Sequence, residues 1–509
     1  MLKTILSIFL VLFLILGGGF AWLFTREGAI ELPGGMVVDV LMVRHALTGG
    51  EVENLESNEL RDRIQLPPGF SLQLWAVGIP NARMLLVTEA GDLLVSSPRA
   101  DAIRLIERDA DGDGSPDGAR LLLTGLDRPH GLDWHDGWLY VGEGDAVSRV
   151  RFDPESRTVS GEPERIITGL PNGGNHWTKT VKVGPDEKLY LTIGSTCNVC
   201  EEEDERRAAM MRFDLDGSNG EIFATGLRNS VGFDWHPVTQ ELFATDNGRD
   251  LLGDDFPPCE VNRVEEGGFY GWPYANAPAI VDPDVGARAP EKVASTIPPV
   301  HNLPAHTAPL GIAFYDGEAF PEPYQNAAFV ALHGSWNRRE KQGYEVLAIR
   351  FDEDGGSRAE RFLTGFQIGD DVRGRPVDVA VGKEGELFIS DDYTGSIYRV
   401  VYGESGSSAK SSSSVAIAKP ADPLAWVPPE DRQFMFREGK ALWEKFECAT
   451  CHVEGAGPGP IRPLVSLSTR YDLSSLENFL RVPQPPMPTY PMSVEDRRKL
   501  SIYLFTRFD

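Results

Sequence analysis

The chain of 509 residues is 41% hydrophobic and 25% charged, the composition of an ordinary globular protein. Asp and Glu (76) outnumber Lys and Arg (49), which gives a formal net charge of −27. Nucleic acid is excluded as an expected partner, because its phosphates need clustered positive charge and the sequence has no basic stripe. Abundant Gly (53) and Pro (37) favour many short strands joined by turns.

The first 35 residues form a separate segment. Residues 5–24 are apolar apart from Ser7 and glycines, and they lie between Lys3 and Arg26. A run of about 20 such residues has the length of a transmembrane helix. A cleaved signal peptide usually has a shorter apolar region and a small-residue cleavage site, and no such site is clear here. We therefore expect an N-terminal transmembrane helix within residues 1–35 as a membrane anchor, with cleavage as the alternative.

Residues 66–402 repeat one pattern, in which an alternating apolar stretch reaches a turn and a second apolar strand follows. Period-two alternation around a turn indicates a hairpin, and recurrence every ~40–60 residues is typical of propeller blades. We predict an all-β, six-bladed β-propeller, with a stack of β-sandwiches as the alternative. An insertion around residues 265–310 should lengthen the fifth unit. The six units are seen at residues 85–95, 131–141, 181–191, 231–244, 311–331 and 377–389.

The composition changes after the propeller. Residues 403–425 are rich in Ser, Gly and Ala, which predicts a linker with too little apolar content to pack. Helical periodicity follows, and residues 426–509 are expected to form a small all-α domain. Its last helix should begin at an N-cap on Ser493, with Glu495 and Asp496 in the first turn.

The all-α region contains the attachment motif of c-type haem, C-x-x-C-H, at Cys448, Cys451 and His452. At this spacing both thiols reach one porphyrin and the histidine ligates its iron. The segment around Met487 resembles the ligand segment of class I cytochromes c, so Met487 is the predicted distal ligand, ahead of Met492. A core-filling role is the alternative for either methionine. Because such haem is attached outside the cytoplasm, we expect a periplasmic cytochrome c domain.

Several propeller motifs resemble those of the glucose/sorbosone dehydrogenases, six-bladed propellers that bind pyrroloquinoline quinone (PQQ) and calcium. The resemblance covers nearly the whole propeller, and it favours the sorbosone-like branch because of GSWNR (334–338) and CNVC (197–200). The other motifs are RPHG (128–131), GNHW (174–177), GLRN (226–229), TDNGRD (245–250), GGFYGWP (267–273) and RGRP (373–376).

The resemblance implies an oxidoreductase with His176 and Arg228 as catalytic residues. A histidine suits the base that removes the hydroxyl proton, since its ordinary pKa lies near the working pH. Arg228 matches the arginine that faces the reactive quinone carbonyl, where a guanidinium stabilises negative charge. Asn229 matches its cofactor-bonding neighbour. A hydrogen-bonding loop histidine and a salt-bridged arginine are the plainer alternatives for the first two.

The resemblance also implies two calcium sites, since calcium prefers oxygen ligands that include backbone carbonyls. The carbonyls of Gly248 and Arg249 would hold the calcium beside the cofactor. Glu260 and the carbonyl of Tyr270 would hold a second, structural ion. Soluble glucose enzymes have proline where Arg249 stands, which puts the local geometry in question.

Three further residues are assigned to the cofactor. Arg373 and Arg375 match the pair that binds the quinone carboxylates, a task suited to planar guanidinium groups. His130 matches a contact at the cofactor edge.

Two features stay open. Asp109, Asp111 and Asp113 begin like a calcium loop, but Arg120 stands where such a loop needs glutamate, so a solvated acidic turn is as good an interpretation. Cys197 and Cys200 form either a disulfide or a pair of thiols.

Together these features predict a periplasmic quinohaemoprotein. It would oxidise a sugar, aldehyde or alcohol with PQQ, pass electrons through its own haem, and deliver them to a downstream respiratory acceptor. A propeller that only binds a ligand or partner, with haem as an electron relay, is the main alternative. A calcium-dependent hydrolase such as a lactonase ranks third, because it gains nothing from haem.

Overall fold

The computed structural model describes residues 62–403 except 353 and 354, most of residues 424–508, and the short strands β1 (Ala29–Leu32), β2 (Met36–Asp39) and β31 (Val415–Ala416). The expected membrane anchor and most of the expected linker lie outside the described residues. No helix among those described is both long and apolar enough to cross a membrane.

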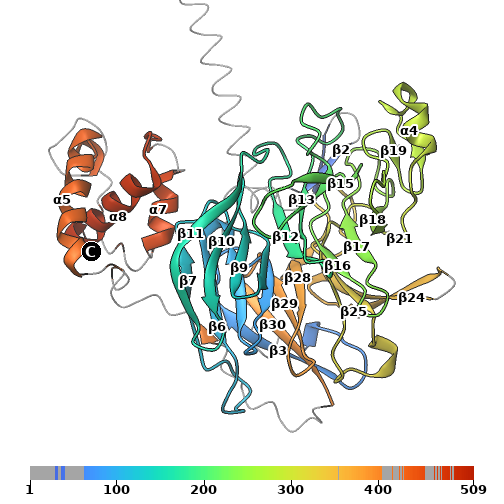
Figure 1. Cartoon of the computed structure of the whole chain (residues 1–509), viewed down its shortest axis with the longest axis horizontal. Coiled ribbons are helices and arrows are strands. Elements are labelled where there is room, and N and C mark those ends of the chain that lie inside the picture. Colours follow the sequence, from blue (N-terminus) through green and yellow to red (C-terminus); the bar gives the residue numbers. More distant parts are fainter. Residues whose placement is uncertain are drawn as a thin grey trace, which may run out of the picture.

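Six sheets form a ring, which confirms the predicted six-bladed propeller (Figure 1). Five have four antiparallel strands, and the sixth has four antiparallel strands and a short parallel one. The first three sheets follow the chain without interruption. They are β4 (Leu85–Val87), β5 (Leu93–Ser97), β6 (Ala102–Glu107) and β7 (Gly118–Thr124); β8 (Leu132–His135), β9 (Trp138–Gly142), β10 (Ala146–Asp153) and β11 (Thr158–Thr168); and β12 (Lys179–Val183), β13 (Leu189–Ile193), β14 (Ala209–Phe213) and β15 (Glu221–Thr225).

The fourth sheet contains the long insertion. Its strands are β16 (Phe233–Trp235), β17 (Leu242–Asp246), β18 (Cys259–Val264) and β21 (His301–Leu303). The insertion between β18 and β21 carries β19 (Ala275–Asn276), β20 (Ile280–Val281), the 3₁₀ turn η2 (Gly286–Arg288) and α4 (Pro290–Ala294). Our assignment of this insertion to the fifth unit was wrong, because its return strand pairs with β18.

The last two sheets complete the ring. The fifth contains β22 (Pro309–Phe314), β23 (Ala328–Leu332), β24 (Glu345–Phe351) and β25 (Ser357–Leu363). The sixth contains β28 (Pro376–Val381), β29 (Leu387–Asp391), β30 (Ser396–Tyr402) and, as its fourth strand, β3 (Phe70–Val77) from the other end of the region. The short strand β31 pairs with the outer side of β3. This pairing closes the propeller, and it explains why residues just after 66 belong to the repeating region.

Aspartates join neighbouring sheets at three places. The carboxylates of Asp133 and Asp378 accept the backbone N–H groups of Val183 (2.6 Å) and Leu85 (2.8 Å), and that of Asp234 accepts the N–H of Phe314 (2.9 Å). Burial raises the pKa of Asp133 and that of Asp378 to about 6. These bonds tie the second sheet to the third, the sixth to the first, and the fourth to the fifth.

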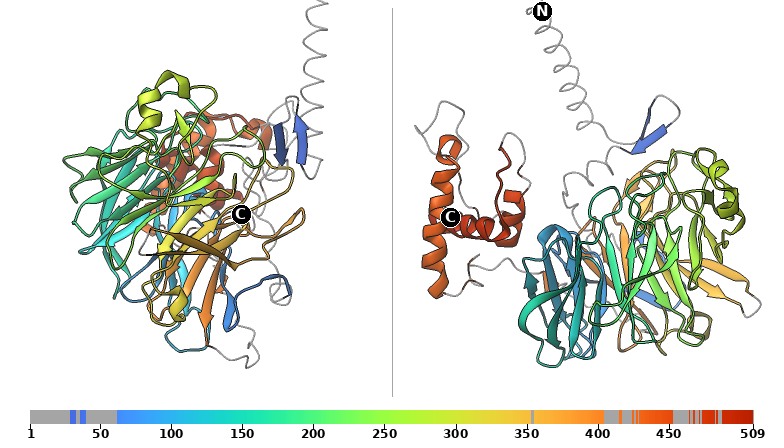
Figure 2. Two further views of the ribbon diagram at one scale, coloured as in Figure 1. Left: turned by 90° about the vertical axis from the view of Figure 1, so that its right-hand side faces the viewer. Right: turned by 45° about the horizontal axis from the view of Figure 1, so that its top comes forward.

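The C-terminal region contains α5 (Pro429–Lys445), α6 (Ala449–His452), α7 (Leu473–Arg481) and α8 (Val494–Phe508) around its own apolar core. Helices α5 and α8 cross closely at Gly439, where an added Cβ would lie 2.0 Å from the carbonyl oxygen of Lys499. The predicted N-cap is confirmed, because Ser493 Oγ accepts the N–H of Asp496 at 3.0 Å. Figure 2 shows these helices beside the propeller.

We predict that Phe70→Ala destabilises the propeller by about 2 kcal/mol, because a half-buried aromatic ring is removed at the closure of the ring. Phe70 packs edge-on against Phe320, Phe362 and Tyr324, with ring centroids 4.7, 5.0 and 5.2 Å away. Thermal and urea unfolding measure the effect. Ile368→Ala, at a side chain 55% exposed, is the control and should change little; equal losses in both variants would contradict the prediction.

Candidate active site

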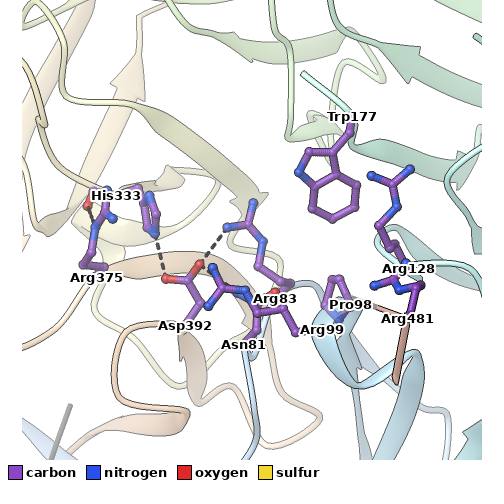
Figure 3. Close-up of a pocket in the computed structure, with 10 residues that line it drawn as sticks. All are labelled: Asn81, Arg83, Pro98, Arg99, Arg128, Trp177, His333, Arg375, Asp392 and Arg481. Carbon is purple, nitrogen blue, oxygen red and sulfur yellow. Dashed lines mark hydrogen bonds and ion pairs between the residues drawn. The ribbon is translucent and has the colours of Figure 1, made fainter. Parts of the chain in front are cut away.

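A cavity of about 340 Å³ opens at one face of the propeller (Figure 3). Arg83 and Arg375 stand just before the first strands of their sheets, β4 and β28, whereas His333 and Asp392 directly follow the second strands β23 and β29. In an antiparallel sheet the start of one strand and the end of the next lie at the same edge, so these residues converge. The lining residues are Asn81, Arg83, Pro98, Arg99, Arg128, Trp177, His333, Arg375, Asp392 and Arg481.

The cavity wall carries more positive than negative charge. It contains five arginines, and Asp392 is the one carboxylate among its lining residues. Asp392 accepts from Arg83 Nη1 at 2.9 Å and pairs with His333 Nε2 at 2.7 Å. Burial alone would raise the pKa of Asp392, but His333, Arg83 and Arg375 lower it well below its usual value. Arg83 Nε is buried without a partner in the described part of the chain. Such a wall suits an anion with several carboxylates.

His176 precedes β12 and is held in one tautomer. Its Nδ1 lies 3.0 Å from the carbonyl oxygen of Ser195, which only accepts, so Nδ1 carries the proton and Nε2 has a free lone pair. Burial and, after it, the charge of Arg228 lower the pKa of His176 to about 3. Gly194 is required here, since an added Cβ would lie 2.5 Å from the Cβ of His176 and 2.8 Å from Asn229 Oδ1.

Arg228 is almost fully buried, and its guanidinium is held by loops on two sides. Nη1 donates to the carbonyls of Asn247 and Gly248, each at 3.1 Å, and Nη2 pairs with Asp250 at 3.2 Å. The backbone N–H groups of Arg228 and Asn229 donate to Asp246 at 2.9 and 2.6 Å. Asp246 at the end of β17 therefore fixes the position of both predicted site residues.

Residues 334–337 connect these two groups of side chains. Arg375 Nη2 donates to the carbonyl of Gly334 at 3.3 Å, and Asn337 Nδ2 donates to Asp250 at 2.9 Å. Through Asp250 the connection reaches Arg228. The cavity and the pair of His176 and Arg228 thus belong to one hydrogen-bonded region.

The other cofactor residues differ in their placement. Arg375 lines the cavity, but the side chain of Arg373 is 41% exposed and bonds Asp371 at 3.0 Å. His130 is fully buried behind the wall, 3.5 Å from Arg83 and edge-on to Trp177. Among the described residues, His130 therefore supports the cavity wall and does not itself line it.

The predicted calcium ligands fall into two places. The Gly248 carbonyl accepts from Arg228, while the side chain of Arg249 pairs with Asp282 at 2.7 Å in the insertion. Glu260 is buried in β18 opposite Asp246 in the strand register, and burial together with that carboxylate raises its pKa.

Oxygen atoms are plentiful around Glu260. Asn262 donates to Glu260 at 2.8 Å, and its Oδ1 is buried without a partner in the described residues. Tyr270 is buried, with its hydroxyl donating to the carbonyl of Arg263 at 2.7 Å. A buried carboxylate beside an unbonded amide oxygen is a donor set that fits a calcium ion.

The haem motif occupies one helical turn. In α6 the N–H groups of Cys451 and His452 both donate to the Cys448 carbonyl at 3.3 Å. Cys448 is buried in the apolar core and Cys451 is exposed. Met492 is also buried in that core, whereas Met487 is half-buried at its margin. Two thiols and an imidazole on one turn beside apolar side chains fit a covalent haem; Met487 as its ligand stays a prediction.

A family model described as TrAA12-like matches residues 64–264 and 290–403, more than half of the chain. The chain belongs to the TrAA12-like family. The gap in the match falls in the insertion between β18 and β21, and the C-terminal helices lie outside it.

Relatives of this TrAA12-like protein include an uncharacterised protein of Borreliella burgdorferi, 32% identical over 68% of this chain and 93% of the relative. The pyrroloquinoline quinone-dependent pyranose dehydrogenase of Coprinopsis cinerea is 23% identical over 66% of this chain and 54% of its own, so the match spans about half of that protein. A Trichoderma reesei Family AA12 structure is similar in fold, with TM-score 0.58 and 22% identity over 69% of this chain and 100% of that chain.

Several residues of the TrAA12-like site were missed by sequence reasoning. Arg83, His333 and Asp392 line the cavity, but none stands in the motifs that indicated the site. Each lies next to a predicted strand, and that position is the only signal the sequence offers. Asp250 ends a recognised motif, although its pairing with Arg228 depends on how two loops fold together.

We predict opposite shifts of the His176 pKa in two variants of the TrAA12-like propeller. Arg228→Gln removes a positive charge and should raise this pKa, whereas Asp250→Asn removes a negative charge and should lower it. NMR titration of histidine-labelled protein measures both shifts. Arg358→Gln, at an exposed arginine of β25 that pairs with Asp352, should leave the pKa unchanged. Shifts of the same sign in the first two variants would contradict the electrostatic argument.

Proposed function

We propose that this protein is a PQQ-dependent dehydrogenase of sugars, aldehydes or alcohols that passes electrons to its own c-type haem. The observation that carries the proposal is an arginine-rich cavity joined by hydrogen bonds to a histidine with a free Nε2. The name of the Coprinopsis relative supports a quinone cofactor and a sugar substrate. Haem attachment supports a periplasmic location, with residues 1–35 as the anchor, 66–402 as the dehydrogenase and 426–509 as the cytochrome domain.

The charges of the site support a quinone with several carboxylates. Arg375 and Arg83 lie at opposite ends of the propeller region in sequence, yet both line the cavity with only Asp392 to balance them. In our proposal these arginines bind the carboxylates, and Arg373 contributes only if its exposed side chain moves from Asp371. When bound, the quinone supplies a two-electron acceptor for hydride.

His176 and Arg228 then have separate tasks. His176 takes the proton of the substrate hydroxyl on Nε2, since Nδ1 is committed to Ser195. The buried guanidinium of Arg228 stabilises negative charge that develops near it, and its carbonyl partners hold it in place. The side chain of Asn229, packed beside Gly194 and His176, is available to bond the cofactor.

A contact between the C-terminal region and the propeller supports electron transfer between them. Arg481 at the end of α7 lines the cavity, with its guanidinium nitrogens 4.0 Å from Asp101 and 3.9 Å from Asp127 of the propeller. Cys448, Cys451 and His452 would hold the haem, which would supply a one-electron acceptor. A tether between donor and acceptor raises the effective concentration of each at the other.

Haem reduction tests the function. The full chain, expressed with haem-attachment machinery and supplied with calcium and PQQ, should show haem reduction in its visible spectrum on adding an aldose, a sorbosone-like aldehyde or an alcohol. His176→Ala should lower the rate by roughly 10²- to 10⁴-fold, because a general base is lost. His135→Ala, at the end of β8, should be neutral.

If dithionite reduces the haem but no substrate does, the dehydrogenase proposal fails. The alternative of a binding propeller with a relay haem then takes its place.

Calcium removal should lower the melting temperature of the propeller, because calcium bound only to the folded state stabilises it. Glu260→Gln should abolish most of this calcium dependence, whereas Glu241→Gln, at an exposed carboxylate, should retain it. Differential scanning calorimetry with and without a chelator measures the effect. Equal calcium dependence in wild type and Glu260→Gln would remove Glu260 from the metal site.

A further inference from the structure

We propose that Asn198 is the positioning residue for Arg228, and that the Cys197–Cys200 disulfide makes this positioning depend on the redox state of the surroundings. The inference rests on the proposed function for the roles of Arg228 and His176. The disulfide is formed in this structure, with a Cα–Cα distance of 6.2 Å, which decides between the two alternatives left by the sequence.

Asn198 uses both its backbone and its side chain to hold Arg228. Its carbonyl accepts from Arg228 Nε at 3.0 Å and from Trp272 Nε1 at 3.2 Å. Its Oδ1 accepts from Arg228 Nη2 at 2.9 Å and from the N–H of Asp250 at 2.8 Å, and its Nδ2 donates to the Asp250 carbonyl at 3.0 Å. Asn198 therefore fixes the guanidinium and the partner carboxylate together.

The same short ring holds His176. Ser195 Oγ donates its proton to the carbonyl of Cys197 at 2.8 Å. The lone pairs of Ser195 Oγ can therefore accept a hydrogen bond from His176 Nδ1, which lies 2.9 Å from it. The orientation of the Cys197 peptide thus supports the tautomer that leaves Nε2 unprotonated. Both predicted catalytic side chains depend on two consecutive residues inside one disulfide ring.

Besides these hydrogen bonds, the disulfide holds the two residues within a long loop. They belong to the long connection between β13 and β14, residues 194–208, which has no strand pairing of its own. Thr196 is tied to Glu202, with its N–H donating at 2.6 Å and its hydroxyl at 2.7 Å. A cross-link limits the backbone conformations of the residues it encloses, which a loop of this length would otherwise sample.

Reductants can reach the bond, because Cys197 and Cys200 are both only partly buried. A dithiol would break the Sγ–Sγ bond by supplying two electrons and two protons. The protein gains two S–H groups, and the dithiol becomes a disulfide. The carbonyls of Cys197 and Asn198 are then free to turn away from Ser195 and Arg228.

Kinetics of the full chain with calcium and PQQ form the first arm of the test. We expect Asn198→Ala, and the double variant Cys197→Ser/Cys200→Ser, to lower kcat by roughly 10- to 100-fold while KM changes less than about threefold. Asn198→Asp retains an oxygen for Arg228 and should recover part of the loss. Glu201→Gln, at an exposed neighbour in the same loop, is the control and should behave as wild type.

A second measurement tests the positioning of His176 without catalytic turnover. The Nδ1 proton of His176, observed by NMR in histidine-labelled protein without substrate, should exchange faster or shift when the disulfide is reduced or replaced. Reoxidation should restore the signal in the wild type. If the wild type oxidises no substrate, the proposed function fails, and this signal still decides whether the ring positions His176.

The proposal is overturned if Cys197→Ser/Cys200→Ser keeps kcat and the exchange rate of the His176 Nδ1 proton within twofold of wild type, with the chemical shift of that proton unchanged. Should the double variant fail to fold, as seen by circular dichroism, Asn198→Ala decides alone, since it leaves the disulfide in place. Unchanged kcat in folded Asn198→Ala then overturns the positioning role.

Discussion

Closure of the ring by β3 is the constraint on which the rest of the propeller depends. Strand β3 comes from the beginning of the propeller region and strands β28–β30 come from its end. The sixth sheet is therefore complete only when the two ends of the region meet. The candidate site lies at this closure, where Arg83 before the first sheet pairs with Asp392 in the sixth. Asp378 holds the same two sheets together through the N–H of Leu85. Opening the ring would therefore destabilise the fold and divide the cavity at once.

The candidate site is preorganised by groups that have no proposed catalytic role. Arg228 makes its bonds mainly to backbone carbonyls, which hold a buried guanidinium without neutralising it. Asp246 fixes the backbone of Arg228 and Asn229 by accepting their N–H groups, while Asp250 pairs with the side chain of Arg228. Burial and the nearby guanidinium keep His176 neutral. Fixed charges of this kind stabilise developing charge without having to reorganise during the reaction.

The C-terminal helices form a second core that meets the propeller near its cavity. Arg481 and the 3₁₀ turn η1 (Pro98–Ala100) bring α7 to the edge of the first sheet. Ion pairs of 3.9–4.0 Å at a partly exposed surface are weak, so this contact favours an orientation more than it stabilises the fold.

Periodicity and short motifs determined the six sheets, the C-terminal helices and the N-cap at Ser493, because each depends mainly on neighbours in the chain. The sequence also placed His176 and Arg228 in recognisable segments, although their roles remain proposals. It assigned the insertion to the wrong sheet, since the partner of β18 lies beyond the insertion and only strand pairing identifies it. Tertiary structure alone decided that Arg83, His333 and Asp392 share a cavity and that Arg373 bonds Asp371 instead of lining it. Arg83 and Asp392 are 309 positions apart, and local pattern carries no information about which distant loops meet.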